Sequence, residues 1–572
     1  MKVLLCTANA RFFHVSLALH SIRSNGPDKT NLEIDLKEYT INQEIRDIFG
    51  DIISQNPDVI GFGLYIWNRE LIFRLGKMIK REFPGIYIVL GGPEVSYTPK
   101  EILEENDWVD SVVLGEGEIS FWQLMETLDK KSYAPVRGVA QRGEKKTSHW
   151  EYQEIEDLNQ LNFAYAKSNE AELKNRILYY ESSRGCPFSC SYCLSGLDGM
   201  VRNRNTELVT KELEMLIAKD IRQVKFVDRT FNADPKHFNE IIDFLVGIDK
   251  PLNFHFEMDA AILKEETIER LAALPEGRVQ LEIGIQSTNE KTLQAVGRHH
   301  AFQKEAEIIK TIKDKTSIHL HLDLIAGLPF ESMEIFEKSF NEVFALEPDQ
   351  LQLGFLKMLQ GSKIRNQSEV YKYHYDEKAP YEVVSNPWLS GQEFHRLKLI
   401  EHCLEETWNS GRLQKTIRFI SDYIYEGNVF RFFKELSCVL DDSSYLMSGR
   451  NGRWWVERIF ELIPLKWGFW SKEIIGCLKW DVITMEKGRW KPEFLGWTDI
   501  SRASFWQNDL FMNDYLPGYQ FKSWRDIQRL YIVEKISPSL LEGVKEEEFQ
   551  EEETILIQLE ESFKWQRIKI GE

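Results

Sequence analysis

The first 130 residues alternate short apolar runs with segments in which apolar residues recur at helical spacing. After the third run, for example, apolar side chains fall at positions 71, 72, 75, 78 and 79, which places them on one face of a helix. Strands that alternate with helices predict a doubly wound parallel sheet. The five expected strands are Lys2–Thr7, Leu32–Asp35, Asp58–Leu64, Ile86–Leu90 and Ser111–Leu114.

Glycines gather at the ends of three of these runs. They form the groups Gly61 and Gly63, Gly91-Gly92-Pro93, and Gly115-Glu116-Gly117-Glu118. Ligands of doubly wound sheets bind at the carboxyl ends of the strands, where glycine allows a backbone to approach closely. Plain tight turns would use the same glycines, so both interpretations stay open. No G-x-G-x-x-G motif follows the first strand, which disfavours a nicotinamide dinucleotide.

A second alternation of strands and helices runs from Ile177 to about Leu359, after a polar, uneven stretch over residues 130–172 that we expect to be a linker with one hairpin. Its repeat of roughly 30 residues is typical of βα units and predicts a partial barrel of the (βα)6 type. Its expected strands are Ile177–Ser183, Gln223–Asp228, Asn253–Asp259, Val279–Gln286, Ser317–Ile325 and Gln350–Leu356.

Several of these strands alternate polar with apolar residues, although parallel strands covered on both faces usually read as continuous apolar runs. Glu282 and Gln286 oppose Ile283 and Ile285, for instance, and Asp323 opposes its apolar neighbours. If helices cover the apolar face, the polar face lines the lumen of the barrel. Buried charge is costly without partners, so we expect a polar cavity there. A half-exposed antiparallel sheet is the alternative.

The chain changes character from about residue 370, where tryptophan becomes frequent and helical patterns such as Gln392–Trp408 dominate. We therefore expect an α/β protein of three domains with a mainly helical end. The expected parts are 1–135 as a doubly wound domain, 136–172 as a linker, 173–365 as a partial barrel, and 366–572 as a mainly helical domain of unknown role.

Composition narrows the possible partners. Of 572 residues, 71 are Lys or Arg and 90 are Asp or Glu, for a net charge of −19. This excess of acid makes nucleic acid an unexpected partner and argues against binding to anionic lipid surfaces. The start lacks a signal peptide, and no run approaches the roughly 18 apolar residues of a membrane span. We expect a cytoplasmic protein.

Three of the seven cysteines fall within eight residues, in the segment Arg-Gly-Cys-Pro-Phe-Ser-Cys-Ser-Tyr-Cys. Cys186, Cys190 and Cys193 have the spacing C-x-x-x-C-x-x-C directly after the first barrel strand. Three thiolates of one loop can hold three irons of a cubane cluster and leave the fourth iron open. Zinc held by three cysteines and a water or a remote histidine is the main alternative, and three unrelated buried thiols are the other.

This loop, with Tyr192 before its last cysteine and a barrel behind it, closely resembles the radical SAM superfamily. Further segments agree: Val227–Asn232, Glu282–Ser287 and Asp323–Pro329. The resemblance implies a [4Fe–4S] cluster on Cys186, Cys190 and Cys193, with S-adenosylmethionine (SAM) on the open iron. It also implies that Tyr192 contacts the adenine of SAM. The residues expected to contact the rest of SAM, each of which would also suit inter-strand hydrogen bonding, are Glu257, Glu282, Gln286, Ser287 and Asp323.

The first 130 residues resemble the cobalamin-binding domain that is fused to one branch of this superfamily. The Asp-x-His-x-x-Gly motif that brings an axial histidine to cobalt in some cobalamin proteins is absent. His14 and His20 are wrongly spaced for it, and we expect each on a helix face. The resemblance implies cobalamin contacts at Thr7, Gly63, Gly91, Gly92, Gly115, Glu116 and Gly117. The tail resembles an uncharacterised C-terminal domain of such proteins.

The resemblance implies a cobalamin-dependent radical SAM enzyme that cleaves SAM reductively to a 5′-deoxyadenosyl radical, most plausibly to methylate an unactivated carbon. A cyclisation, rearrangement or oxidation without methyl transfer is the second hypothesis. A non-catalytic cobalamin or redox sensor is the third. The expected partners are a small-molecule or peptide substrate and an electron donor such as flavodoxin or ferredoxin.

Overall fold

The computed structural model describes residues 1–27, 32–132, 134–143, 150, 152–196, 199–298, 301–441, 451–498, 505–520, 522–542, 551–559 and 563–569. The chain forms two compact units. The first comprises Met1–Met333 and Gly354–Gly391, and the second comprises Glu334–Leu353 and Gln392–Glu572.

The first unit begins with a six-stranded sheet of order β2-β1-β3-β4-β5-β6, in which every pair is parallel except β5 with β6. The doubly wound sheet predicted from the sequence is confirmed. Its strands are β1 (Lys2–Asn9), β2 (Glu33–Thr40), β3 (Val59–Gly63), β4 (Tyr87–Gly91), β5 (Ser111–Val113) and β6 (Val139–Gln141).

Apolar side chains are buried on both faces of this sheet. Leu4 belongs to the cluster on one face and Leu5 to the cluster on the other, because successive side chains of a strand point to opposite faces. Burial on both sides explains why these strands read as continuous apolar runs. The helices of this region are α1 (Leu17–Ser24), α2 (Ile45–Ser54), α3 (Arg69–Glu82), α4 (Pro93–Ser96), α5 (Pro99–Glu105) and α6 (Gly117–Asp129).

The stretch expected to be a linker with a hairpin is partly structural. β6 lies beyond α6 and pairs antiparallel with β5, so it extends the first sheet and forms no hairpin of its own. A short helix, α7 (Glu170–Leu173), precedes the second sheet. A three-residue strand is too short to leave an alternating pattern, which is why the sequence does not reveal it.

The second sheet has the order β7-β10-β11-β12-β13, and each of these pairs is parallel. This excludes the antiparallel alternative. The end of β14 (Gln350–Phe355) lies against β13, where a Cβ on Gly354 would come within 3.3 Å of the Leu324 carbonyl oxygen. The other strands are β7 (Ile177–Tyr180), β10 (Gln223–Phe226), β11 (Asn253–Met258), β12 (Val279–Gln286) and β13 (His319–Ala326).

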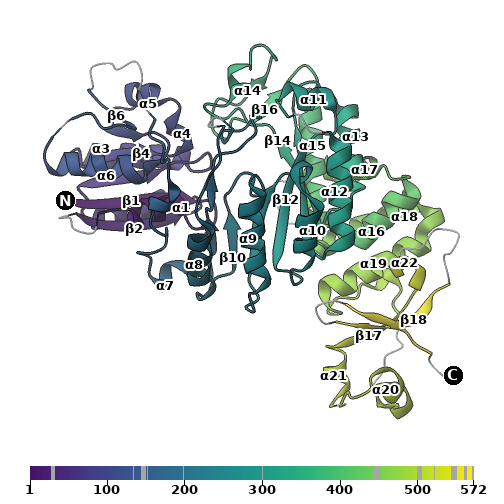
Figure 1. Ribbon diagram of the computed structural model, residues 1–572. Coiled ribbons are helices and arrows are strands. Elements are labelled where there is room, and N and C mark those ends of the chain that lie inside the picture. The colour runs from purple at the N-terminus through teal and green to yellow at the C-terminus, as the bar shows by residue number, and fades with distance from the viewer. Residues whose placement is uncertain are drawn as a thin grey trace. The chain divides into compact units, whose positions relative to one another are not determined.

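The alternation of polar and apolar residues in this sheet corresponds to its two faces. In β12 and β13 every second residue is buried and apolar, while the residues between them are partly accessible. Helices lie along the apolar side of the sheet (Figure 1), so the polar side faces the interior of the partial barrel. These helices are α8 (Thr206–Ile217), α9 (Pro235–Val246), α10 (Glu265–Ala272), α11 (Glu290–Ala295) and α12 (Phe302–Lys315).

The second unit is mainly helical, as predicted, and also contains a three-stranded antiparallel sheet that the sequence did not predict. None of the described helices in the chain is long and apolar enough to cross a membrane. The principal elements of the second unit are α13 (Met333–Phe344), α15 (Gly391–Leu404), α16 (Gln414–Phe419), α17 (Val429–Asp441), α18 (Gly452–Lys466), α19 (Ser471–Glu486), β17 (Tyr531–Ile536), β18 (Glu553–Gln558) and β19 (Trp565–Arg567).

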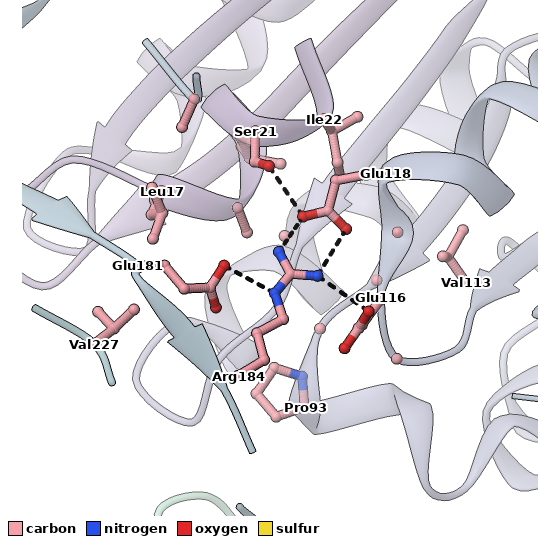
Figure 2. Close-up of a pocket in the computed structure, with 18 of the residues that line it drawn as sticks. Leu17, Ser21, Ile22, Pro93, Val113, Glu116, Glu118, Glu181, Arg184 and Val227 are labelled. Atoms are coloured by element: carbon pink, nitrogen blue, oxygen red, sulfur yellow. Dashed lines mark hydrogen bonds and ion pairs between the residues drawn. The ribbon is translucent and has the colours of Figure 1, made fainter. Parts of the chain in front are cut away.

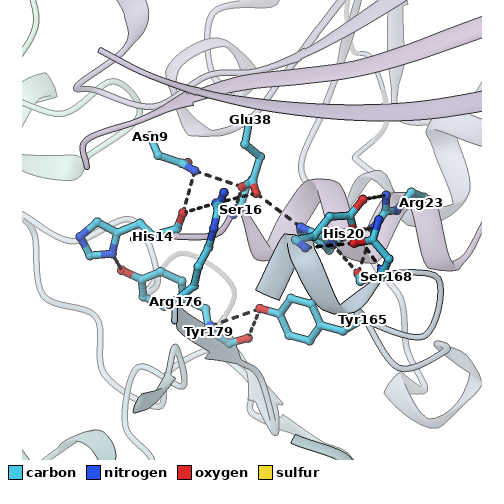
Figure 3. Close-up of polar contacts among 12 residues, drawn as sticks. Asn9, His14, Ser16, His20, Arg23, Glu38, Tyr165, Ser168, Arg176 and Tyr179 are labelled. Carbon is cyan, nitrogen blue, oxygen red and sulfur yellow. Dashed lines mark hydrogen bonds and ion pairs between the residues drawn. The ribbon is translucent and has the colours of Figure 1, made fainter. Parts of the chain in front are cut away.

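A buried polar network joins the two sheets of the first unit (Figure 3). Its centre is Glu38 on β2, whose side chain is only 6% exposed. Glu38 accepts hydrogen bonds from Ser16 N at 2.5 Å and from Arg176, next to β7, at 3.3 Å, and its carboxylate lies 3.6 Å from Nε2 of His20. Buried charges of this kind are tolerated only when they are paired.

The network also corrects an expectation about the histidines. His20 lies on α1 as predicted, but it is fully buried, with its Nδ1 2.8 Å from the hydroxyl of Ser168. His14 lies before α1 and not on a helix, where it forms a bridge to Ile177 at the start of β7 and its Nδ1 lies 2.8 Å from the hydroxyl of Tyr179. Both histidines therefore hold the joint between the sheets.

We predict that Glu38→Gln lowers the free energy of unfolding by about 3–5 kcal/mol at neutral pH, because it leaves the buried charge of Arg176 uncompensated. Burial acts to raise the pKa of Glu38, but the ion pair with His20 and the hydrogen bonds from Asn9 and Ser16 outweigh it and hold that pKa below its usual value of 4.5. A depressed pKa adds stability above about pH 4.5 that is lost as the pH falls through the folded-state value. The difference from wild type should therefore narrow below about pH 4.5.

Thermal unfolding followed by circular dichroism across this pH range measures the effect. The matched control is Glu33→Gln on the same strand, because Glu33 is 68% exposed and its ion pair with Lys2 lies at the surface. This control should leave the midpoint of unfolding unchanged. Equal midpoints for the two variants would contradict a central role for Glu38.

Candidate active site

A cavity of about 470 Å³ lies at the carboxyl ends of β3, β4 and β5, between the first sheet and the loop after β7. We call it the glycine-lined cavity. Six of the predicted cobalamin contacts line it: Gly63, Gly91, Gly92, Gly115, Glu116 and Gly117. A Cβ on Gly91 would meet only Val113, at 3.8 Å, so the space above this strand end is open. Gly92 has φ +109° and lies so close to the Leu64 backbone that a Cβ would come within 2.3 Å of its oxygen, which requires glycine.

Thr7, the seventh predicted cobalamin contact, does not line this cavity. Its side chain is fully buried, and its hydroxyl donates to the Gly63 carbonyl at 2.9 Å and accepts from Asn68 at 3.1 Å. Thr7 therefore fixes the end of β3, and its contact with cobalamin stays a prediction. Among the described residues that line the cavity there is no histidine.

Arg184 lies at the wall of the glycine-lined cavity among three carboxylates (Figure 2). Its guanidinium group pairs with Glu118 at 2.5 Å, Glu181 at 2.8 Å and Glu116 at 3.1 Å. Glu118 also accepts a hydrogen bond from Ser21 of α1 at 3.0 Å. Burial acts to raise the pKa of Glu118, but the charge and hydrogen bond of Arg184 outweigh it and lower that pKa. Arg184 thus ties the loops of the first sheet to the loop that leads to the cysteines.

The cysteine loop is held at its beginning and in its middle. Gly185, directly before Cys186, has φ +93°, and a Cβ there would come within 1.8 Å of the Met200 carbonyl oxygen. Ser191 N donates to the Val296 carbonyl at 2.8 Å, and the Ser191 carbonyl accepts from Ile364 N at 2.8 Å. All three cysteines of the loop are free thiols. Their positions are therefore set by the barrel and not by a disulfide.

Cys186, Cys190 and Cys193 line one cavity of about 160 Å³ within the partial barrel, which we call the cysteine-lined cavity. Five of the predicted SAM contacts line it too: Tyr192, Glu257, Glu282, Gln286 and Asp323. Ser287, the sixth, does not. It is fully buried, and its hydroxyl donates to Glu331 at 2.5 Å, so it fastens the end of β12 to the loop after β13.

The charge of the cysteine-lined cavity suits a cationic ligand with polar groups. Four carboxylates line it against two arginines. Burial raises the pKa of Glu257 to about 7 against the opposing charge of Arg229. The pKa of Glu282 shifts in the opposite direction. Burial acts to raise it, but hydrogen bonding and the charges of neighbouring histidines lower it, and His255 lies 2.9 Å from its carboxylate.

Three buried polar atoms at this cavity make no hydrogen bond among the described residues, and one of them, Asp323 Oδ1, forms an ion pair with His321 at 3.1 Å. The other two are Gln286 Oε1 and Arg298 Nε. Gln286 follows a bulge in β12 and has φ +71°, a conformation that is rare for a residue with a side chain. Buried polar atoms are normally satisfied, so these two fit a polar ligand such as SAM.

Sequence reasoning missed the arginines of both cavities. Arg298, whose side chain is 11% exposed, lines the cysteine-lined cavity and pairs with Glu305 at 3.1 Å and Asp259 at 3.4 Å. Arg229 lines both cavities. A single arginine has no spacing signal of its own. Only the position of Arg229 at a strand end, next to Asp228, could have drawn attention to it.

The zinc alternative receives no support from the described residues. Nowhere among them do three or more His, Cys, Asp or Glu side chains gather closely enough to hold one metal ion. The three thiols instead share the wall of a cavity, as thiolates do when each binds a different iron of one cluster.

Comparison with known protein families assigns the three parts of the chain. The model of the radical SAM superfamily matches residues 180–343, which contain the cysteine loop and most of the partial barrel, so this part of the chain is a radical SAM domain. The model of the B12 binding domain matches residues 5–124 before it, and the model described as protein of unknown function (DUF4080) matches residues 369–558 after it.

Individual relatives agree with this assignment. The cobalamin-dependent radical SAM methyltransferase TokK of Streptomyces tokunonensis is 25% identical over 340 residues, which are 55% of this chain and 49% of TokK. The anaerobic magnesium-protoporphyrin IX monomethyl ester cyclase of Rubrivivax gelatinosus is 24% identical over 55% of this chain and 58% of its own length. The chain thus spans about half the length of the curated relatives it matches.

A solved structure of the cobalamin-dependent SAM radical enzyme OxsB, with aqua-cobalamin and SAM bound, superposes with a TM-score of 0.58. It covers 85% of this chain and 79% of OxsB at 13% identity. At this identity the likeness shows the fold alone, and it confirms the predicted fold class.

We predict that Arg184→Met lowers the free energy of unfolding by about 3–5 kcal/mol, because the buried Glu118 and the partly buried Glu181 lose their counter-charge, while Glu116 keeps its ion pair with Arg202. Arg184→Lys should fall between wild type and Met, because lysine keeps the charge but not the planar fork of donors. The midpoint of thermal unfolding, measured without oxygen, checks both. Arg81→Met is the control, since Arg81 is 83% exposed and should change nothing. A midpoint of Arg184→Met equal to this control would contradict the prediction.

Proposed function

We propose that this protein is a cobalamin-dependent radical SAM enzyme that methylates an unactivated carbon of its substrate. The observation that carries the proposal is the pair of adjoining cavities in the first unit. The cysteines of the radical SAM domain line one, the glycine-rich strand ends of the B12 binding domain line the other, and Arg229 belongs to both walls.

The cysteine-lined cavity supplies the groups that a [4Fe–4S] cluster and SAM need. The thiolates of Cys186, Cys190 and Cys193 would bind three irons, and Gln286 and Arg298 have unpaired polar atoms for the amino-acid end of SAM. The carboxylates of the wall match the positive charge of SAM. A reduced cluster bound here would supply one electron to SAM, whose C–S bond would break to give methionine and a carbon radical that removes hydrogen from an unreactive carbon.

The glycine-lined cavity fits cobalamin at the strand ends, as glycine permits close contact. Cobalamin supplies a methyl group when it carries one. Because no described lining residue is a histidine, cobalt would receive no imidazole from this wall. Leu17 and Val113 add apolar surface to the wall (Figure 2), which excludes water, while the carboxylates around Arg184 offer acceptors to polar groups of the ligand.

Such chemistry requires a one-electron donor, and we infer a small redox protein such as flavodoxin or ferredoxin. It also requires that the open iron be kept from oxygen. We therefore place the enzyme in a reducing cytoplasm, where its substrate is a small molecule or a peptide.

A second candidate function is a radical cyclisation, rearrangement or oxidation without methyl transfer. The similarity to a cyclase over 55% of the chain favours it. The two candidates share the reductive cleavage of SAM and differ in what the cobalamin domain contributes.

The deciding experiment is to purify the full chain without oxygen, from cells supplied with cobalamin, and to measure iron and cobalt per chain. With SAM and a reductant, 5′-deoxyadenosine should form, and S-adenosylhomocysteine should form if methyl transfer occurs. Cys190→Ala should lose the iron and the 5′-deoxyadenosine, whereas Cys438→Ala, which removes an exposed thiol, should keep both. No 5′-deoxyadenosine in the iron-loaded wild type would contradict an enzyme and favour a sensor.

We predict that Gly91→Leu lowers the amount of bound cobalt at least about tenfold, because the leucine side chain would project into the open space of the glycine-lined cavity. A loss of about 1.4 kcal/mol of binding free energy is enough for a tenfold decrease in affinity. The apo protein should keep the midpoint of unfolding, since a Cβ at this position meets no close atom. Gly50→Leu is the control, because nothing lies within 4 Å of a Cβ there either but Gly50 is on the exposed side of α2. Unchanged cobalt in Gly91→Leu would contradict this site for cobalamin.

A further inference from the structure

Arg229 lies where the two cavities meet. Among the described residues it is the one that lines both the glycine-lined and the cysteine-lined cavity. It is the third residue after β10, within the segment Val227-Asp228-Arg229-Thr230-Phe231-Asn232. A substrate that passes between the two cofactors proposed above would have to lie beside it.

The residues on either side of Arg229 are fastened to the barrel. Asp228 is buried and accepts hydrogen bonds from Ser182 N at 3.0 Å and from the hydroxyls of Ser182 and Ser183, both at 2.6 Å. Thr230 lies with its hydroxyl 3.3 Å from the Cys186 sulfur. The backbone at Arg229 is therefore fixed.

The next two residues of the segment are fixed as well. Phe231 is buried, stacks on Phe256 with ring centroids 4.1 Å apart, and donates its N–H to the Glu257 carbonyl at 2.9 Å. Asn232 donates to the Asp259 carbonyl at 2.7 Å. Arg229 is thus the member of this segment that lines both cavities, and its side chain is 53% exposed.

The guanidinium group of Arg229 is poorly paired. Its single ion pair among the described residues is with Glu257, at 3.7 Å, which is beyond hydrogen-bond distance. The other arginines of the site are different: Arg184 has three close carboxylates and Arg298 has two. Arg229 therefore keeps a planar fork of donors available, the geometry that binds carboxylate or phosphate in two parallel hydrogen bonds.

We propose that Arg229 binds an oxyanion of the substrate, a carboxylate or a phosphate, and so sets the substrate between the two cavities. The proposal rests on the proposed function and narrows the substrate to an anionic molecule. The carboxylate of SAM itself has a separate cation in Arg298, which lies beside the cysteines with one donor unpaired. Arg229 is thus left for the second reactant.

The test measures whether anions protect Arg229 from phenylglyoxal, a reagent that modifies accessible guanidinium groups. The full chain is purified without oxygen, treated and digested, and the modification of each arginine is measured by mass spectrometry of its peptide. The probes are acetate and inorganic phosphate at constant ionic strength, with acetamide as the neutral counterpart of acetate. Arg81, 83% exposed and remote from either cavity wall, is the internal control in the same digest.

We expect acetate, phosphate or both to slow the modification of Arg229 by at least about fivefold at saturation, as a bidentate ion pair shields the group, while acetamide has no effect and Arg81 reacts equally throughout. Stronger protection by acetate than by phosphate indicates a carboxylate substrate, and the reverse indicates a phosphate. Equal modification with and without the anions would overturn the proposal. Protection by SAM alone would also overturn it, because Arg229 would then belong to SAM.

A second measurement uses methyl-labelled SAM and the small-molecule fraction of cell extract, separated beforehand into anionic and non-anionic pools. With the wild-type protein, label should enter the anionic pool. With Arg229→Met the incorporated label should fall at least about a hundredfold, as expected when an ion-paired anchor is lost. With Arg229→Lys the incorporation should recover in part. Label in the non-anionic pool alone would overturn the proposal. Iron, cobalt and 5′-deoxyadenosine are measured on the same samples. Their absence would count against the proposed function, whereas the protection of Arg229 by anions does not depend on them.

Discussion

The arrangement of the first unit depends on the ion pairs of Arg184. One guanidinium group faces Glu116 and Glu118, which begin α6 of the first sheet, and Glu181, which follows β7 of the second. Glu116 also pairs with Arg202 at 2.5 Å, whereas Glu118 and Glu181 depend on Arg184 for compensation of their charge in a partly buried place. The glycine-lined cavity exists because the two sheets meet at this point at a fixed distance. Two residues after Arg184 comes Cys186, so the same contact also determines where the cysteine loop starts.

Much of the fold could be predicted because the strands carry clear patterns. Both ends of β12 (Val279–Gln286) were predicted to the residue, because polar and apolar side chains alternate strictly over its eight positions. β6 was missed because three residues carry no period. Ser287 directly follows β12, whereas Thr7, the expected end of its strand, lies within β1, which continues to Asn9; both side chains point into the fold. Sequence position gives the strand end, and only the surrounding hydrogen bonds decide whether a side chain faces the cavity or fastens the loop.

The arginines show a second limit of sequence reasoning. Cysteines at fixed spacing identify themselves, whereas the meaning of an arginine depends on how many carboxylates lie around it in space. In a chain with a net charge of −19, most cations have acidic neighbours, as Arg298 and Arg204 do. Arg229 stands out only by comparison with these, because its neighbour Asp228 is occupied by three hydrogen bonds from serines and is not its partner.

Hydrogen bonds couple the segment around Arg229 to the loop that carries the three cysteines. Asp228 is bonded to the serines that precede Arg184, and Thr230 touches the sulfur of Cys186. Any shift of the cysteine loop would therefore move Arg229 with it. A substrate held by this arginine would keep its distance to the cysteine-lined cavity even if the loop relaxed. Reactions between two bound partners are sensitive to displacements of about 1 Å, so fastening the substrate anchor and the cysteine loop to one set of hydrogen bonds is a direct way to keep the reacting atoms aligned.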